Sequence, residues 1–403
     1  QNLLVEMFYM DGNELRFIED LFNMNFFGGC TMKELYIHIG LSKTGSSAIQ
    51  SWLSLNADRL KKQGYDYADL SPSAKNGKIT AGNGVLLFQA CNQQNWAEVE
   101  RLIAHVYFMR NNKAIVSSES LQGVSVEAIN KISSLCNRHS IRVKVIAYAR
   151  SAYELLYSNY LQGIKRHGFT FAFGEEQKLS YLTQRQHLQN YYNVFDKNLQ
   201  IVNYDSVKND VFSSFSSCVG FIDKGLVVKN KKVNRSLTVA EASLLLQMNK
   251  IHNGIFSTEI SDYLIEGSSS KLTSVLYSEK LIEKVKFNTT DDLIWINETF
   301  SPIGGNIETW HAEISNDNET TEDYESIVDT VIQWALGYEN QRKKTEFVEF
   351  LRDFAVFLEN DFIHKSLLLM EKAKKLRPNG AFILRRVDIY KEQIKTHNNK
   401  MYE

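Results

Sequence analysis

Cysteine is scarce in this chain of 403 residues, and its distribution restricts the chemistry that the chain can carry. No C-x-x-C pair occurs among the four cysteines, which are Cys30, Cys91, Cys136 and Cys218. Their wide separation argues against a disulfide framework and against a zinc ribbon. A reducing compartment fits this usage best, so we expect a cytoplasmic location.

Long apolar runs and an excess of charge are also missing. No run approaches the roughly 20 apolar residues that a membrane span requires, so we expect no membrane span. Lys and Arg number 46 against 47 Asp and Glu, which leaves a formal net charge of -1. This balance gives no electrostatic case for nucleic acid as a partner.

The length suffices for one large domain with an accessory domain, or for two ordinary domains. Residues 1–31 are rich in Phe and Leu but are interrupted by charges, so they do not read as a signal peptide. We treat them as an extension whose status the sequence leaves open, because Met32 directly precedes the first expected strand. Met32 is therefore a candidate natural start.

Apolar runs typical of strands alternate with helical patterns over the first half of the chain. The expected strands are 34–39, 113–118, 141–149 and 199–204. Such alternation favours an α/β fold with a mostly parallel sheet that helices cover on both faces. His38, inside the first strand, is expected to be a core histidine.

Three polar side chains fall just past the ends of expected strands. They are Lys43, Glu119 and Arg150. In parallel sheets ligands gather at the carboxyl ends of the strands. We therefore expect these three side chains to converge on one cleft.

The loop from Gly40 to Ser47 joins the first strand to an amphipathic helix. Free backbone N–H groups at a helix N-terminus, together with the helix dipole, form a site for an anion. A nucleoside-triphosphate loop reads G-x-x-x-x-G-K-[ST], but here Ser46 stands where the lysine belongs. Lys43 instead precedes the second glycine, Gly45, which argues against an ordinary ATP or GTP site.

A second anion site is predicted where the third strand leads into a helix. Arg150 ends this strand, and Ser158 follows in the helix. A guanidinium group offers the bidentate geometry that suits a phosphate, and a hydroxyl two turns further on can reach the same anion.

The paired motifs resemble the sulfotransferases that use 3′-phosphoadenosine 5′-phosphosulfate (PAPS). The resemblance covers about residues 32–300 and implies a P-loop sulfotransferase-like, three-layer fold. In that family the lysine loop grips the 5′-phosphosulfate, which here implies Lys43, Thr44, Gly45, Ser46 and Ser47. The arginine and the serine grip the 3′-phosphate. The chain departs from the family in lacking Pro before the loop lysine and Asp-Pro after the arginine.

The resemblance also implies roles for residues of two other segments. Glu119, after Ser117 and Ser118, stands where these enzymes commonly carry the catalytic base. The loop of Asn234, Arg235 and Ser236 looks like the segment that closes over the nucleotide in many bacterial members. The alternative is that Glu119 or Ser236 has only a structural role, as the cap of the helix that follows it.

The activity implied is transfer of the sulfuryl group from PAPS to a hydroxyl or amine, with Lys43 and Glu119 as catalytic residues and with no metal. A carbohydrate or glycolipid acceptor is expected by resemblance. Two alternatives stay open: a P-loop nucleotide kinase or ATPase, and a catalytically inactive relative that binds a protein.

The chain beyond the expected catalytic domain, 32–310, reads as an acidic linker at 311–326 and a helical region at 327–403. A pair of amphipathic helices is expected between residues 345 and 391. Within them the residues at tetratricopeptide spacing are Phe350, Phe357, Met370, Ala373 and Pro378, although Phe354 replaces a small residue. One such hairpin cannot bury its own faces, so it packs on the catalytic domain, another copy or a protein partner.

Overall fold

The computed structural model describes residues 32–68, 81–175, 179, 182, 184–228, 236–267, 279–309 and 321–400. The extension of residues 1–31 lies outside the described residues, as do Asn234 and Arg235.

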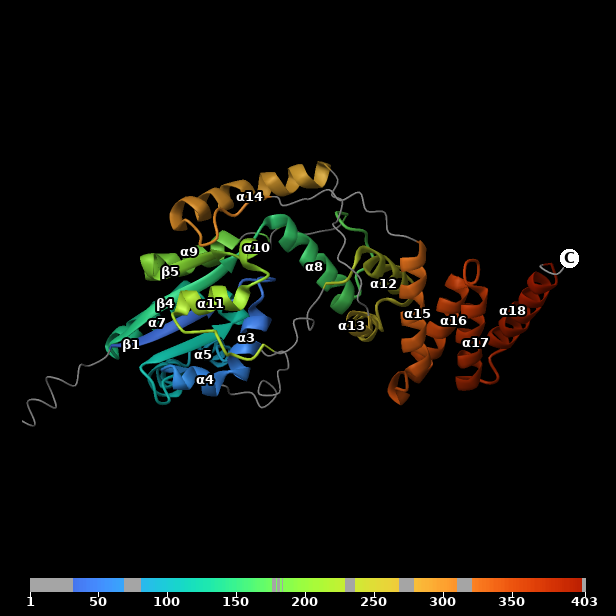
Figure 1. Cartoon of the computed structure of the whole chain (residues 1–403), viewed down its shortest axis with the longest axis horizontal. Helices are drawn as coiled ribbons and strands as arrows, with labels where there is room; N and C mark the ends of the chain where they lie inside the picture. Colours follow the sequence, from blue (N-terminus) through green and yellow to red (C-terminus); the bar gives the residue numbers. More distant parts are fainter. Residues whose placement is uncertain are drawn as a thin grey trace, which may run out of the picture.

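A five-stranded sheet forms the centre of the N-terminal part (Figure 1). Its strands, all parallel and in the order β2-β3-β1-β4-β5, are β1 (Lys33–Ile39), β2 (Tyr65–Asp66), β3 (Lys113–Ser118), β4 (Ile141–Ala149) and β5 (Leu199–Asn203). The predicted α/β class and parallel sheet are therefore confirmed. Because β1 lies between β3 and β4, the chain reverses its direction of winding at β1, which is where ligands bind in open α/β sheets.

Apolar side chains alternate between the two faces of the sheet, as the strand period requires. In β1, Leu35, Ile37 and Ile39 belong to one hydrophobic cluster, whereas Tyr36 belongs to the cluster on the opposite face. His38 is fully buried on the Tyr36 side and contacts the rings of Tyr148 and Phe215, so the predicted core histidine is confirmed.

Helices cover both faces. The Leu35 face packs against α5 (Val85–Asn92), α6 (Trp96–Arg101) with the π-helix η3 (Leu102–Val106), α7 (Val126–Arg138), α9 (Gln184–Phe195) and α14 (Glu279–Phe300). The Tyr36 face packs against α3 (Ser46–Leu55), α4 (Ala57–Lys62) and α11 (Val211–Val219). Short helices lie between these elements: the 3₁₀ turns η4 (Glu119–Gly123) and η6 (Asp196–Asn198), and α10 (Tyr204–Val207).

The remaining helices form an array that extends from the sheet (Figure 1). They are α12 (Val239–His252), α13 (Ser257–Gly267), α15 (Thr321–Gly337), α16 (Lys344–Leu358) after the turn η7 (Gln341–Lys343), α17 (Ile363–Leu376) and α18 (Ala381–Lys400). Helix α8 (Ala152–His167) links the two parts, because Tyr160, Leu161 and Ile164 from its second half join the same hydrophobic cluster as the array. None of the described helices combines the length and the apolar character that crossing a membrane demands.

Three expectations about element limits are corrected. The strand predicted to Tyr204 ends at Asn203, because the Asn203 side chain accepts a hydrogen bond from the Asp205 amide and begins α10. The end of the predicted acidic linker is helical, since α15 begins at Thr321. The predicted helix pair at the C-terminus is α16 and α17, but α15 precedes it and α18 follows Pro378.

Candidate anion-binding site

The loop after β1 reaches α3 through two residues with left-handed backbone conformation. Lys43 has φ 60°, which is strained for a residue with a side chain, and Gly45, the N-cap of α3, has φ 77°. No side chain caps this helix and its first turn contains no acidic residue. Among the described residues no acceptor is found for the amides of Ser46 and Ser47. The N-terminus of α3 therefore keeps free donors and the positive end of its dipole.

Close packing explains both glycines of the loop. A Cβ on Gly40 would lie 2.4 Å from Ser46 Oγ and 3.1 Å from Glu119 Cγ. A Cβ on Gly45 would lie 3.0 Å from Cε2 of Tyr204. The loop is thus held between the end of β3, which provides Glu119, and the start of α10, which provides Tyr204.

Two hydroxyl groups of the loop differ in whether they are hydrogen-bonded within the protein. Thr44 Oγ1 donates to the carbonyl of Leu41 at 2.7 Å, so this predicted ligand fixes the turn instead. Ser46 is 1% exposed, and its Oγ has no partner among the described residues. An unpaired buried hydroxyl is costly, which makes Ser46 a candidate ligand-binding group.

The amine of Lys43 points towards α8. Its Nζ donates to Oε1 of Gln162 at 3.0 Å. Burial lowers the pKa of Lys43, whereas the nearby carboxylate of Glu119 opposes this shift and Arg166 and Arg150 add to it. The amine is therefore a partly desolvated cation with the carboxylate of Glu119 as its acidic neighbour.

Glu119 directly follows β3 and lies beside the loop after β1, with its Cγ near Gly40. Its side chain is exposed at the surface, but the surrounding protein atoms partly desolvate the carboxyl group and raise its pKa, while the charge of Lys43 opposes the rise. The residue does not supply the cap of the 3₁₀ turn that follows, because Ser118 Oγ accepts from the Ser120 amide at 3.2 Å. Among the described residues no hydrogen-bond donor engages the Glu119 carboxylate, which leaves it available as a base.

Arg150 lies against the same loop, at the end of β4. Its Nη1 donates to the carbonyl oxygen of Lys43 at 2.9 Å. Its Nη2 lies 3.0 Å from Asp205 Oδ1 and 3.2 Å from Glu154 Oε2, and its guanidinium carbon lies 5.1 Å from the ring centre of Tyr204. The residue is 7% exposed and its Nε has no partner among the described residues. The guanidinium group therefore holds the loop and carries a buried ion pair.

Four predicted site residues remain, one on α8 and three before α12. Ser158 is half-buried on α8, one turn after Glu154 and one turn before Gln162, so it lies on the side of the helix that reaches the loop. Ser236 is half-buried ahead of α12, where Thr238 and Glu241 form the capping box, so Ser236 is not the helix cap. Asn234 and Arg235 lie outside the described residues.

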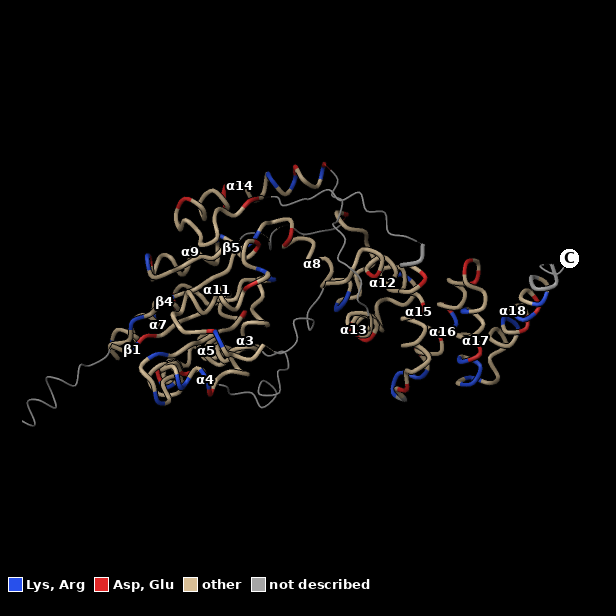
Figure 2. Tube along the Cα trace, viewed as in Figure 1, with Lys and Arg blue, Asp and Glu red and all other residues tan. Residues whose placement is uncertain are grey.

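Sequence reasoning missed four side chains of the site. Gln162, Glu154, Tyr204 and Asp205 all contact Lys43, Gly45 or Arg150. Asp205 follows β5 and accepts the Ser151 amide at 2.6 Å, so the strand-end rule that found Arg150 could also have found it. Figure 2 shows charges of both signs gathered at this edge of the sheet.

The site thus joins a strained lysine loop, an uncapped helix N-terminus, a carboxyl group and a buried arginine at the carboxyl ends of three neighbouring strands, β3, β1 and β4. Comparison of the chain with protein-family models, curated proteins and solved structures found no match.

Proposed function

We propose that the chain is a PAPS-dependent sulfotransferase with a P-loop sulfotransferase-like fold. One observation carries the proposal: the Lys43 amine, the Glu119 carboxyl group and the uncapped N-terminus of α3 lie together at the carboxyl edge of the sheet, and Arg150 bonds to the same loop. This convergence supports the resemblance that the motifs suggest. An ordinary structural loop needs neither a buried unpaired hydroxyl nor a strained lysine.

The residues present fit the 5′ end of the nucleotide. The free amides of Ser46 and Ser47 and the unpaired Ser46 hydroxyl are the donors that a phosphosulfate group needs. Lys43 adds the positive charge. Thr44 takes no part through its hydroxyl, because that group is bonded to Leu41.

The fit to the 3′-phosphate requires an exchange of partners at Arg150. Its side chain contacts two carboxylates, of which Asp205 is 4% exposed and Glu154 is 36% exposed. The more exposed Glu154 is the one that a phosphate would displace, because its side chain already reaches water, whereas Asp205 is buried and also accepts the Ser151 amide. Ser158, one turn further along α8, then lies within reach of the same anion.

PAPS supplies the sulfuryl group, and this chain supplies positioning and charge. Glu119 accepts the proton of the acceptor hydroxyl while the new oxygen–sulfur bond forms. Lys43 stabilises the negative charge that develops on the phosphate oxygen as the old oxygen–sulfur bond breaks. The acceptor class that we propose is a carbohydrate or a glycolipid.

The test is calorimetric binding of 3′-phosphoadenosine 5′-phosphate and of ATP, with and without magnesium, followed by transfer of label from radioactive PAPS to glycan and lipid extracts. We expect the bisphosphate to bind without magnesium and more tightly than ATP. Lys43→Ala should lower turnover by about 10²- to 10³-fold, because it removes a preorganised cation. Lys62→Ala, at an exposed lysine of α4, is the matched control and should change neither quantity.

Three results would contradict this assignment. Tighter binding of ATP in the presence of magnesium would favour a nucleotide kinase. Binding of the bisphosphate without any transfer would favour an inactive relative. Turnover that survives in Lys43→Ala at saturating PAPS would remove Lys43 from the chemistry.

A further inference from the structure

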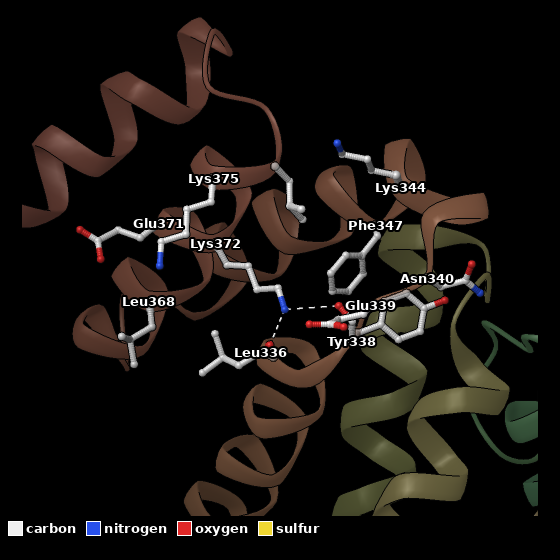
Figure 3. A pocket seen from close by; sticks show the side chains of 11 residues that line it. Leu336, Tyr338, Glu339, Asn340, Lys344, Phe347, Leu368, Glu371, Lys372 and Lys375 are labelled. Carbon is white, nitrogen blue, oxygen red and sulfur yellow. Dashed lines mark hydrogen bonds between the residues drawn. The ribbon is translucent and has the colours of Figure 1, made fainter.

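A second concave site lies in the helical array, among the end of α15, the start of α16 and the middle of α17 (Figure 3). Its volume is about 770 Å³, which is within the range of clefts that hold small organic molecules. No residue that lines it belongs to the loop site at β1. This pocket is therefore independent of the proposed transferase function.

Positive charge exceeds negative charge in the lining. The pocket contains the amines of Lys344, Lys372 and Lys375 and the carboxylates of Glu339 and Glu371. Glu371 is paired with Lys391 of α18, which lies outside the lining, at 2.9 Å. Within the part of the chain that the structure describes, Glu339 is therefore the one carboxylate of the lining without a partner outside it, and the lining has three lysine amines.

Lys372 also cancels the negative end of a helix. Its Nζ donates to the carbonyl of Leu336 and, at 3.3 Å, to that of Tyr338, at the C-terminus of α15 (Figure 3). Burial lowers the pKa of Lys372, the charge of Glu339 opposes this shift, and the charge of Lys375 adds to it, so the two amines repel each other. A bound anion would relieve this repulsion.

The helix that begins at the pocket adds a lysine and an aromatic ring to the lining. The first turn of α16 contributes Lys344 and Phe347 to the lining. The N-cap, Lys343, makes no side-chain hydrogen bond to this turn. The carbonyl end of α15 is thus neutralised by Lys372, whereas Glu346 in the first turn of α16 offsets part of the positive charge at the amide end of that helix.

Apolar side chains form the other part of the lining. Phe347 is 2% exposed, and Leu368 on α17 is 49% exposed although it is a large apolar residue. Leu336 and Leu376 complete this surface. A hydrated inorganic anion would leave the exposed side chain of Leu368 in water, so the lining suits a ligand that also has an apolar part.

We propose that this pocket binds an amphipathic organic anion, with a carboxylate or phosphate head beside Lys344 and Lys375 and an apolar chain over Leu368. The lining contains lysines but no arginine, so it recognises a point charge and sets no bidentate geometry. The shared chemistry is one anionic head on an aliphatic chain.

The test uses the full chain and calorimetric titration with dodecanoate, dodecyl phosphate, dodecanol and inorganic phosphate, each below its micelle concentration. We expect both dodecanoate and dodecyl phosphate to bind, and the one that binds more tightly identifies the preferred head group. Dodecanol and inorganic phosphate should bind at least about tenfold more weakly. Lys344→Ala/Lys375→Ala should weaken dodecanoate by about tenfold, and Leu368→Ser should weaken it by several fold.

Lys374→Ala/Lys395→Ala is the matched control, because it removes two exposed lysines of α17 and α18 that do not line the pocket. We expect this control to keep wild-type affinity, and all variants to keep the wild-type melting temperature. The proposal is overturned if dodecanol or inorganic phosphate binds as tightly as dodecanoate, if no anion binds, or if the control weakens binding as much as the Lys344/Lys375 variant does.

Discussion

At the scale of single residues, Arg150 combines a structural role with its proposed role in phosphate binding. The Arg150–Asp205 pair is almost completely buried, with side chains 8% and 4% exposed. Replacing one partner of such a pair leaves the other charge buried without compensation. A loss of nucleotide affinity in an Arg150 variant is therefore ambiguous unless stability is measured too.

We expect Arg150→Ala to lower the free energy of unfolding by about 3 to 5 kcal/mol, because Asp205 is then left buried and unpaired. The double variant Arg150→Ala/Asp205→Asn should recover most of this loss. Binding of 3′-phosphoadenosine 5′-phosphate should stay weak in both variants. Urea unfolding and calorimetry at one pH separate the two quantities, and recovered nucleotide binding in the double variant would show that Arg150 acts only through the fold.

Glu119 gives a prediction about pH. Burial raises the pKa of its carboxyl group above the usual range, against the opposing charge of Lys43, and the base must be deprotonated to accept a proton. Turnover should therefore fall as the pH drops through this raised pKa, at a higher pH than a fully solvated glutamate would give. The acidic limb of the profile of kcat should be absent from the residual activity of Glu119→Gln.

Glu127→Gln, at an exposed glutamate of α7, is the control for this profile. It should keep both the wild-type rate and the acidic limb. A limb that persists in Glu119→Gln would assign the titration to another group.

At the scale of elements, the sequence predicts the central strands well because each is an apolar run with a clear end. The strands predicted at 113–118 and 141–149 match β3 and β4. The strand-end rule also identifies Lys43, Glu119 and Arg150, which the structure brings together at one edge of the sheet. Local pattern is enough for these features, since parallel strands place their carboxyl ends at one edge.

The features that sequence reasoning missed depend on contacts between distant residues. Lys43 and Gln162 are separated by 119 positions along the chain, and no local pattern pairs them. The acidic start of α15 resembles a linker, but Lys365 of α17 lies 2.8 Å from Glu325 and 2.9 Å from Asp329. This lysine neutralises two carboxylates that would otherwise repel each other on one helix face.

At the scale of the whole molecule, the helical array has a single hydrophobic cluster that spans the predicted domain limits. Phe256, between α12 and α13, lies within 6.0 Å of the ring centres of Trp334, Tyr338, Phe347 and Phe350. The second half of α8 joins this cluster, while Gln162 on the same helix contacts Lys43. The array is thus packed against the helix that borders the proposed nucleotide site.

A chain that ends at Thr309 tests this unity, because it lacks α15 to α18 and exposes the apolar sides of α12, α13 and α8. Each large apolar side chain returned to water costs about 1.5 to 3 kcal/mol, so the shortened chain should melt at a lower temperature or aggregate, and should bind the nucleotide weakly. A chain that ends at Asn379 loses α18 but keeps the aromatic contacts of Phe256. Its melting temperature should lie between those of the full chain and the chain that ends at Thr309.

Phe256→Ala and Phe287→Ala are a matched pair of variants that test, in the full chain, how much the shared hydrophobic cluster stabilises the fold. Phe256 is 2% exposed, and its truncation should cost about 3 to 5 kcal/mol; Phe287 on α14 is 90% exposed and should cost little. Thermal melting and size-exclusion chromatography give the readout. A chain ending at Thr309 that stays monomeric and melts with the full chain would mean that the sheet and α8 are stable without the array, because the shared cluster would then contribute nothing measurable to the fold.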